Sequence, residues 1–224
     1  MKKVKLFVLA GAILTLFSCD KNSDDPSMPS GPWGAGYIPV YPGNYWIYDH
    51  YRIDTLGNET LLNVYDSVVI TGTASVGGHS YIVFMGTWMS GIDIVDTVMM
   101  IRDSLGYYVD PLGNIHFSYS NFSDTLHTLV SLNNHTGDTL YELSYTMEKD
   151  PKWVTVPAGT FESLNYLGTV YTYDPNPNVP VYRYMDELYS QGTGLVLTTY
   201  YYLGSPLRFE RRLVKYHVSD QSLK

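Results

Sequence analysis

The chain has 224 residues, of which 45% are hydrophobic and 16% charged, a balance that indicates a globular protein and excludes a disordered one. Acidic residues outnumber basic ones by 22 to 14, and this surplus of negative charge argues against nucleic acid as a partner. Tyrosine is abundant, with 22 copies against 7 of phenylalanine. Because Tyr suits half-buried strands, where the ring packs and the hydroxyl stays hydrated, the composition favours a β-rich domain.

The N-terminus has the organisation of a signal peptide. Three lysines precede an apolar run over residues 6–17. As a helix at about 1.5 Å per residue, this run spans roughly 18 Å, too short for the ~30 Å hydrocarbon core of a bilayer. We therefore expect residues 1–18 to be removed during export.

The end of this run resembles a lipobox. Leu16-Phe17-Ser18-Cys19 has an aliphatic residue three positions before the cysteine and a small residue directly before it. Cys19 is also the only cysteine, so it cannot form an intramolecular disulfide. The resemblance implies a lipoprotein that carries a diacylglyceryl thioether and an amide-linked acyl chain at Cys19. Two or more acyl chains hold a protein stably at a membrane. The membrane is therefore the partner expected through the anchor at Cys19.

Residues 19–32 are acidic and proline-rich, the composition of a solvated tether. The acidic tract after Cys19 resembles the export signal of surface lipoproteins in the Bacteroidota, which favours the outer membrane and surface display over a periplasm-facing anchor. Residues 1–18 hold three of the basic residues and none of the acidic ones, so the mature net charge is −11. We expect residues 33–224 to form a single domain.

This domain is predicted to be all-β, because no convincing amphipathic helix occurs in it. Residues 141–148, for example, alternate between apolar and polar side chains with the period of two that is typical of a strand with one hydrated face. The expected strands cover residues 45–54, 60–71, 79–87, 92–102, 105–109, 115–119, 124–131, 139–148, 152–156, 161–173, 179–188, 195–203 and 207–218.

Short loops rich in Asp and Gly join these strands, which predicts a single antiparallel meander, since parallel pairs would need crossover helices. The expected architecture is a strongly curved sheet or incomplete barrel, with a two-sheet β-sandwich as the alternative. In residues 207–218 the apolar positions change phase, which predicts a β-bulge near Leu213.

Two further stretches resemble a group of Bacteroidota envelope lipoproteins that have no assigned activity. Residues 42–48 (Pro-Gly-Asn-Tyr-Trp-Ile-Tyr) are similar to the opening strand of that group. Residues 153–161, which end in Pro-Ala-Gly-Thr-Phe, and residues 192–196 are similar to its later signature. The resemblance implies an all-β envelope protein and assigns no catalytic residue. In physical terms, Val156-Pro157-Ala158-Gly159 fits a tight hairpin turn.

No motif for catalysis or metal binding is apparent. The six histidines lack the His-Glu-x-x-His spacing, and a single cysteine cannot complete a closed zinc site. We therefore expect no metal and no cofactor, and we assign no catalytic residue. The carboxylates of a hydrolase come from distant segments, so a carboxylate-dependent hydrolase of the cell envelope stays an alternative.

Aromatic residues give the remaining indication of a binding site. Trp46 and Tyr48 share one face of the first expected strand, and Tyr200 and Tyr202 cluster on a later one. On a curved sheet, such residues would line a pocket for an apolar ligand or form a platform for sugar rings, or else serve only as core packing. We predict a non-catalytic binding or assembly module for a glycan, a lipid or a partner protein, with a purely structural envelope component as the other alternative.

A Cys19→Ala precursor tests the anchor. Without the thiol no acyl chain can be attached, so the variant should move from the detergent phase to the aqueous phase in a phase-partitioning experiment on producing cells. Equal partitioning of the variant and the parent chain would show that Cys19 is not the anchor.

Overall fold

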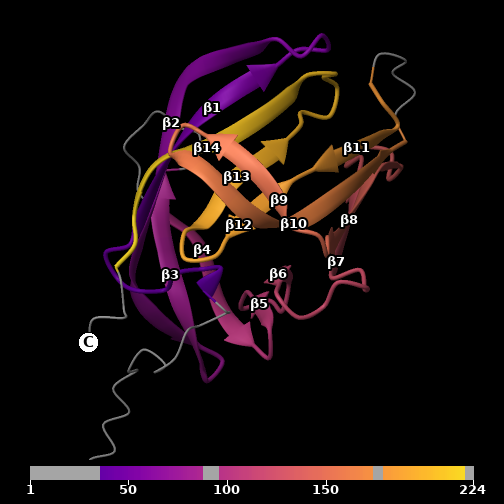
Figure 1. The fold of residues 1–224 in the computed structure, drawn as a ribbon. Helices are drawn as coiled ribbons and strands as arrows, with labels where there is room; N and C mark the ends of the chain where they lie inside the picture. The colour runs from indigo at the N-terminus through magenta and orange to yellow at the C-terminus, as the bar shows by residue number, and fades with distance from the viewer. Residues whose placement is uncertain (1–35, 88–95, 174–178, 220–224) are drawn as a thin grey trace, which may run out of the picture.

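The computed structural model describes residues 36–87, 96–173 and 179–219, and these residues form one antiparallel sheet without an α-helix (Figure 1). Its strands are β1 (Tyr45–Ile53), β2 (Glu59–Val76), β3 (His79–Thr87), β4 (Asp96–Ser104), β5 (Tyr107–Val109), β6 (Ile115–Ser118), β7 (His127–Leu132), β8 (Thr139–Met147), β9 (Lys152–Val156), β10 (Gly159–Thr172), β11 (Tyr182–Met185), β12 (Glu187–Ser190), β13 (Gly194–Tyr200) and β14 (Arg208–His217). No helix in the described ranges is long and apolar enough to cross a membrane.

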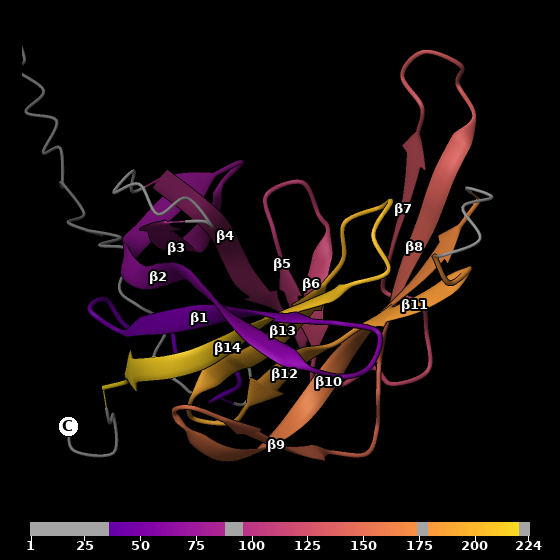
Figure 2. The same cartoon turned by 90° about the horizontal axis from the view of Figure 1, so that it is seen from above.

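The sheet is a meander in which the first and last strands also pair with each other. From β6 back to β1, each strand lies beside its neighbour in the sequence, and β1 then pairs with β14. The path continues through β13, β12, β10 and β8 to β7, while β9 and β11 pair with the long strand β10. Figure 2 shows the strong curvature of the sheet and the β7–β8 hairpin that extends from it. The predicted fold class, a curved sheet forming an incomplete barrel, is confirmed, and the sandwich alternative is wrong.

The two ends of the sheet are β6 and β7, which do not pair with each other. Instead, β6 contacts β10 and β12 through side chains. The Tyr166 hydroxyl donates a hydrogen bond to the Ile115 carbonyl at 2.5 Å, and the rings of Phe117 and Tyr189 lie 4.6 Å apart. These contacts close the interior at the point where the ladder of backbone hydrogen bonds is interrupted.

Most expected strands lie where the alternation of side chains placed them, and residues 152–156 match β9 in full. The clearest difference is the strand expected at 179–188, which is two strands, β11 and β12. Asn165 on β10 explains the break: its amide donates to the Asp186 carboxylate at 2.6 Å, and its carbonyl oxygen accepts from the Glu187 N–H at 3.1 Å. Part of the range 92–102 lies outside the described residues.

The bulge predicted near Leu213 is confirmed. Ile47 lies opposite Lys215, but Tyr48 lies opposite Leu213, so Val214 is the extra residue on β14. A second irregularity occurs on the other side of β1, where Asp49 faces Tyr65 and the next residue faces Leu62. Such insertions bend a strand and re-aim its side chains, and here they flank the middle of β1 on both sides. The turn predicted at Pro157 and Ala158 is also present, because Val156 pairs with Gly159.

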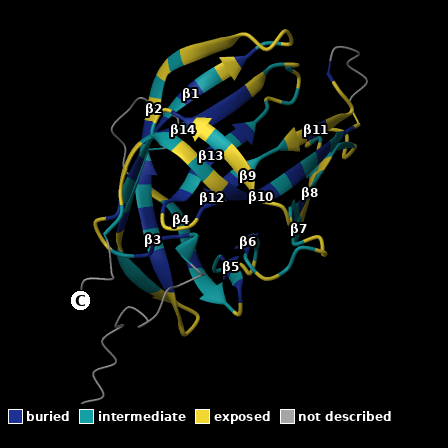
Figure 3. Cartoon of the chain, viewed as in Figure 1, coloured by how far each residue is buried: buried dark blue, intermediate teal, exposed yellow. Residues whose placement is uncertain are grey.

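The core lies on the inner face of the curve. Figure 3 shows buried residues along β3, β10, β13 and β14, whereas the tips of the hairpins are exposed. Alternate residues of β1 are buried, including Trp46 and Tyr48, so these two share the inner face as the sequence predicted. Ile70, Ile82, Ile101 and Leu213 are almost completely buried and surround the same interior from four strands.

Candidate functional site

A cavity of about 180 Å³ lies in the curve of the sheet and is partly open to solvent. Strands β1–β4, β6 and β12–β14, together with the segment before β1, provide its walls. Its lining residues are Ile38, Trp46, Tyr48, Val68, Phe84, Val98, Met99, His116, Glu187, Tyr189, Gly194, Leu195, Thr198 and Arg211. A cavity of about 150 Å³ holds a benzene molecule, so this one is large enough for a small apolar ligand.

A row of polar side chains crosses one wall of the cavity. Glu187 on β12 lies opposite Thr198 on β13, and Thr198 lies opposite Arg211 on β14. Arg211 in turn lies opposite His50 on β1. Directly opposed residues of antiparallel strands point to the same face, so the register alone gathers four polar groups from four strands.

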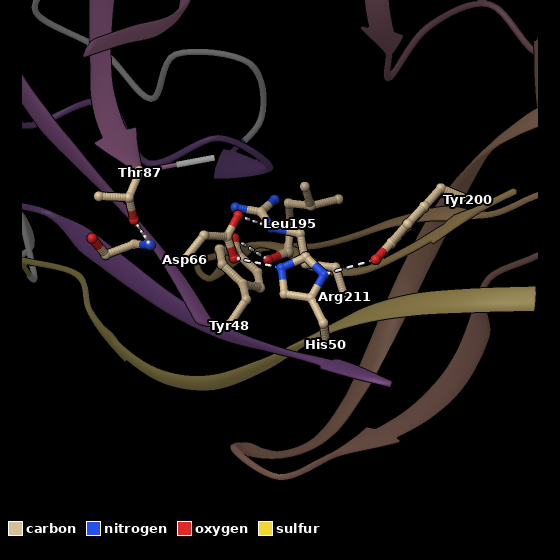
Figure 4. Close-up of polar contacts among 8 residues, drawn as sticks. Tyr48, His50, Asp66, Thr87, Leu195, Tyr200 and Arg211 are labelled. Atoms are coloured by element: carbon tan, nitrogen blue, oxygen red, sulfur yellow. Dashed lines mark hydrogen bonds and ion pairs between the residues drawn. The ribbon is translucent and has the colours of Figure 1, made fainter. Parts of the chain in front are cut away.

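Behind this row is a buried ion pair (Figure 4). The Arg211 Nε donates to Asp66 Oδ2 at 2.7 Å, and Asp66 is fully buried. The Tyr48 ring lies over the guanidinium, 3.6 Å from its central carbon, which adds a cation–π contact. Burial raises the pKa of Tyr48, so its phenol stays protonated. Because separating a buried pair leaves an uncompensated charge, Asp66 and Arg211 hold β2 and β14 in fixed positions on either side of β1.

His50 extends this network toward Tyr200. One ring nitrogen, Nε2, lies 3.2 Å from Asp66 Oδ1, and the other, Nδ1, lies 3.0 Å from the Tyr200 hydroxyl. The order hydroxyl, imidazole, carboxylate is that of a nucleophile activated by a base. Burial raises the pKa of Tyr200 to about 12, so the phenol remains protonated at neutral pH. However, Tyr200, His50 and Asp66 are not among the residues that line the cavity, so we interpret this relay as a structural network.

Glu187 is the carboxyl group among the residues that line the cavity. It accepts a hydrogen bond from the Tyr189 hydroxyl at 3.3 Å and interacts with the Tyr145 hydroxyl. Burial raises the pKa of Glu187 to about 7, an effect that the two hydroxyl groups and the positive charge of Arg211 oppose. The cavity wall thus contains a group that exchanges a proton near neutral pH, a property that often marks functional sites.

The aromatic residues predicted to bind a ligand fall into two places. Trp46 and Tyr48 line the cavity, and each is 3% exposed. Tyr200 lies beyond the polar row and contacts His50, while Tyr202 is 53% exposed and packs on Phe209. Only the first pair therefore shares a cavity. A ligand role for all four residues stays a prediction, and Cys19 lies outside the described residues.

Sequence reasoning missed Glu187, Asp66 and Arg211. No motif or spacing links residues 66, 187 and 211, which lie on three strands far apart in the sequence. The phase change near Leu213 was the one signal in this region, since it marks the strand that carries Arg211. Within the described part of the chain, no group of three His, Cys, Asp or Glu side chains is positioned to hold a metal ion.

The fold and the cavity define an all-β protein with a small, mainly apolar interior site. No protein-family model matches the chain, and no curated protein matches it in sequence. Two solved structures are similar: a candidate lipoprotein from Parabacteroides distasonis (TM-score 0.45, 14% identity, 81% of this chain and 98% of that one) and a candidate exported protein with a YmcC-like fold from Bacteroides fragilis (TM-score 0.44, 13% identity, 80% and 98%). At this level of similarity they assign no function to the chain.

Replacing Arg211 by Met tests the buried ion pair. The variant leaves the Asp66 carboxylate buried without its cation, so the free energy of unfolding should fall by about 3–5 kcal/mol in urea denaturation. The control is Glu59→Gln, which removes an exposed partner of Arg212 and should cost less than about 1 kcal/mol. Adding Asp66→Asn to Arg211→Met should restore part of the loss. Equal costs for Arg211→Met and Glu59→Gln would contradict the assignment.

Glu187 should give the stability of the protein a distinct pH dependence. Because its pKa is raised in the folded state, the folded chain binds this proton more tightly than the unfolded chain does. The resulting stabilisation is complete below the ordinary pKa of Glu and is lost as the pH rises to about 7. Glu187→Gln removes this pH-dependent contribution, so the stability of the variant relative to the parent chain should increase as the pH rises from 4.5 to 7. Urea denaturation at a series of pH values in this range measures the difference. A difference that stays constant over this range would count against a raised pKa.

Proposed function

We propose that this chain is a lipid-anchored protein of the bacterial outer membrane whose β-domain binds an apolar molecule in its cavity without transforming it. The anchor rests on the signal peptide and on the lipobox that ends at Cys19. The acidic tether after Cys19 favours display at the cell surface. The binding role rests on the cavity, because a purely structural domain has no need of an unfilled interior.

The proposal rests on how Trp46 and Tyr48 are held in the cavity wall. The Trp46 indole N–H donates to the Thr193 carbonyl at 2.6 Å, and the Tyr48 hydroxyl donates to the Leu195 carbonyl at 2.9 Å. Both polar groups are therefore satisfied within the protein, and the rings are held rigidly with apolar surface toward the cavity. A ligand that enters gains contact with fixed aromatic walls and requires little ordering of the side chains.

The remaining walls favour an apolar ligand over a glycan at this site. Val68, Phe84, Val98 and Met99 contribute aliphatic, aromatic and thioether surface. A sugar presents hydroxyl groups in several directions, and burying them against such a surface without hydrogen bonds would be unfavourable. An acyl chain or another small apolar molecule has no such requirement.

A hydrolase is the second candidate, and Glu187 is the observation that favours it. A carboxyl group with a pKa near 7 is suited to general acid–base catalysis at neutral pH. Glycosidases use two carboxyl groups that flank the bond to be cleaved. Glu187 is the one carboxyl group among the described residues that line the cavity. Asp66 does not line it and is already bound by Arg211 and His50. We therefore prefer binding.

Toluene is a suitable probe, because it is apolar and small enough for the cavity. We expect ligand-observed NMR to detect its binding to the mature protein. Val68→Phe, which adds volume to a lining residue, should weaken toluene binding at least tenfold. The control is Val76→Phe on the same strand, an exposed position that should leave binding unchanged. If toluene does not bind, or if both variants behave alike, the cavity is not the binding site.

A further inference from the structure

The cavity has two walls of different chemistry. Val68, Phe84 and Met99, from β2, β3 and β4, form an apolar wall. The other wall belongs to β12, β13 and β14 and carries Glu187, Thr198 and Arg211 in one cross-strand row. A ligand that fills this space meets apolar surface on one side and hydrogen-bonding groups on the other.

We propose that the cavity selects an uncharged apolar molecule with a single hydroxyl group, which lies against Thr198 and Glu187 while the apolar body packs on β2–β4. This inference rests on the proposed binding function and specifies its ligand. A hydroxyl is both donor and acceptor, so it can bond to a second hydroxyl and to a carboxyl group at the same time.

Thr198 is the first group that favours a ligand with a hydroxyl. Its Oγ1 is buried and has no hydrogen-bond partner among the described residues, although the side chain lines the cavity. Nearly all buried polar atoms in proteins have a partner, so an unsatisfied hydroxyl in a cavity wall indicates a place for one. The hydroxyl can rotate about χ1 between staggered positions, which allows the oxygen to meet a ligand hydroxyl.

Glu187 is the second group. It lies directly opposite Thr198, and its interactions with the Tyr189 and Tyr145 hydroxyl groups use only part of what a carboxyl group can accept. When ionised, Glu187 accepts a hydrogen bond from a ligand hydroxyl, and when protonated it also donates one. A hydroxyl head group is therefore satisfied in either state of the carboxyl.

A charged head group fits the same place poorly. A carboxylate would lie beside Glu187, and the cation that lines the cavity, Arg211, is already bound to Asp66. An ammonium group would approach the Arg211 charge and lose its hydration, and the attraction of Glu187 does not reliably offset that loss in a buried site. The raised pKa of Glu187 has the same cause, since burial in the cavity wall makes its charged form less favourable.

Four compounds of one shape test the inference: toluene, benzyl alcohol, benzoate and benzylammonium. Their affinities for the mature protein are compared by ligand-observed NMR at pH 6 and pH 8. We expect benzyl alcohol to bind at least tenfold more tightly than either charged compound at both pH values. Thr198→Val keeps the shape of the wall without the hydroxyl. It should weaken the binding of benzyl alcohol about two- to tenfold, while the affinity for toluene stays within about twofold of that of the parent chain.

Thr198→Ser is the matched control, since it keeps the hydroxyl and should keep the preference for benzyl alcohol. The inference is overturned if benzoate or benzylammonium binds as tightly as benzyl alcohol, or if Thr198→Val weakens toluene and benzyl alcohol equally. In those cases toluene still binds and the proposed function stands. If none of the four compounds binds, the proposed function fails together with the inference.

Discussion

The ion pair between Asp66 and Arg211 is the interaction on which the geometry of the interior depends. The two residues come from β2 and β14, the strands on either side of β1, and both are buried. A lone charge in this position would be strongly unfavourable, so the two strands must keep the register that brings the side chains together. The registers of β14 with β13 and of β13 with β12 then align Arg211 with Thr198 and Glu187. The polar row of the cavity therefore includes a residue that the ion pair holds in place.

The pairing of the first and last strands has a related consequence. Because β1 pairs with β14, the ends of the described chain meet in the middle of the sheet, and the ladder of backbone hydrogen bonds is interrupted between β6 and β7 instead. The bulges lie on β2 and β14, the neighbours of β1, while the regular alternation of β1 places Trp46, Tyr48 and His50 in the interior. Residues of β1, β3 and β4 all line the cavity, which lies inside the curve that these strands form.

Much of the fold was predictable, and the reasons are local. Alternation with a period of two identifies a strand by itself. The Asp- and Gly-rich loops at residues 54–58, 103–106 and 110–114 form turns that use the Asp side chain and a Gly with positive φ. The phase change near Leu213 located a bulge without any knowledge of its partner strand. The break between β11 and β12 was not predictable, because its cause is Asn165 on a different strand. A local pattern does not contain that contact.

The candidate site also has features that the sequence predicts and features that depend on the tertiary structure. The sequence by itself predicts an export signal with a lipobox, and it determined that the domain is built from antiparallel strands and that Trp46 and Tyr48 share one face, because each of these depends on neighbours within a few positions. Only the tertiary structure decided that Tyr200 and Tyr202 lie apart from that pair, and that Glu187, Thr198 and Arg211 meet. Those relations depend on which strand lies beside which and in what register, and both are set by long-range pairing and by one buried pair of charges.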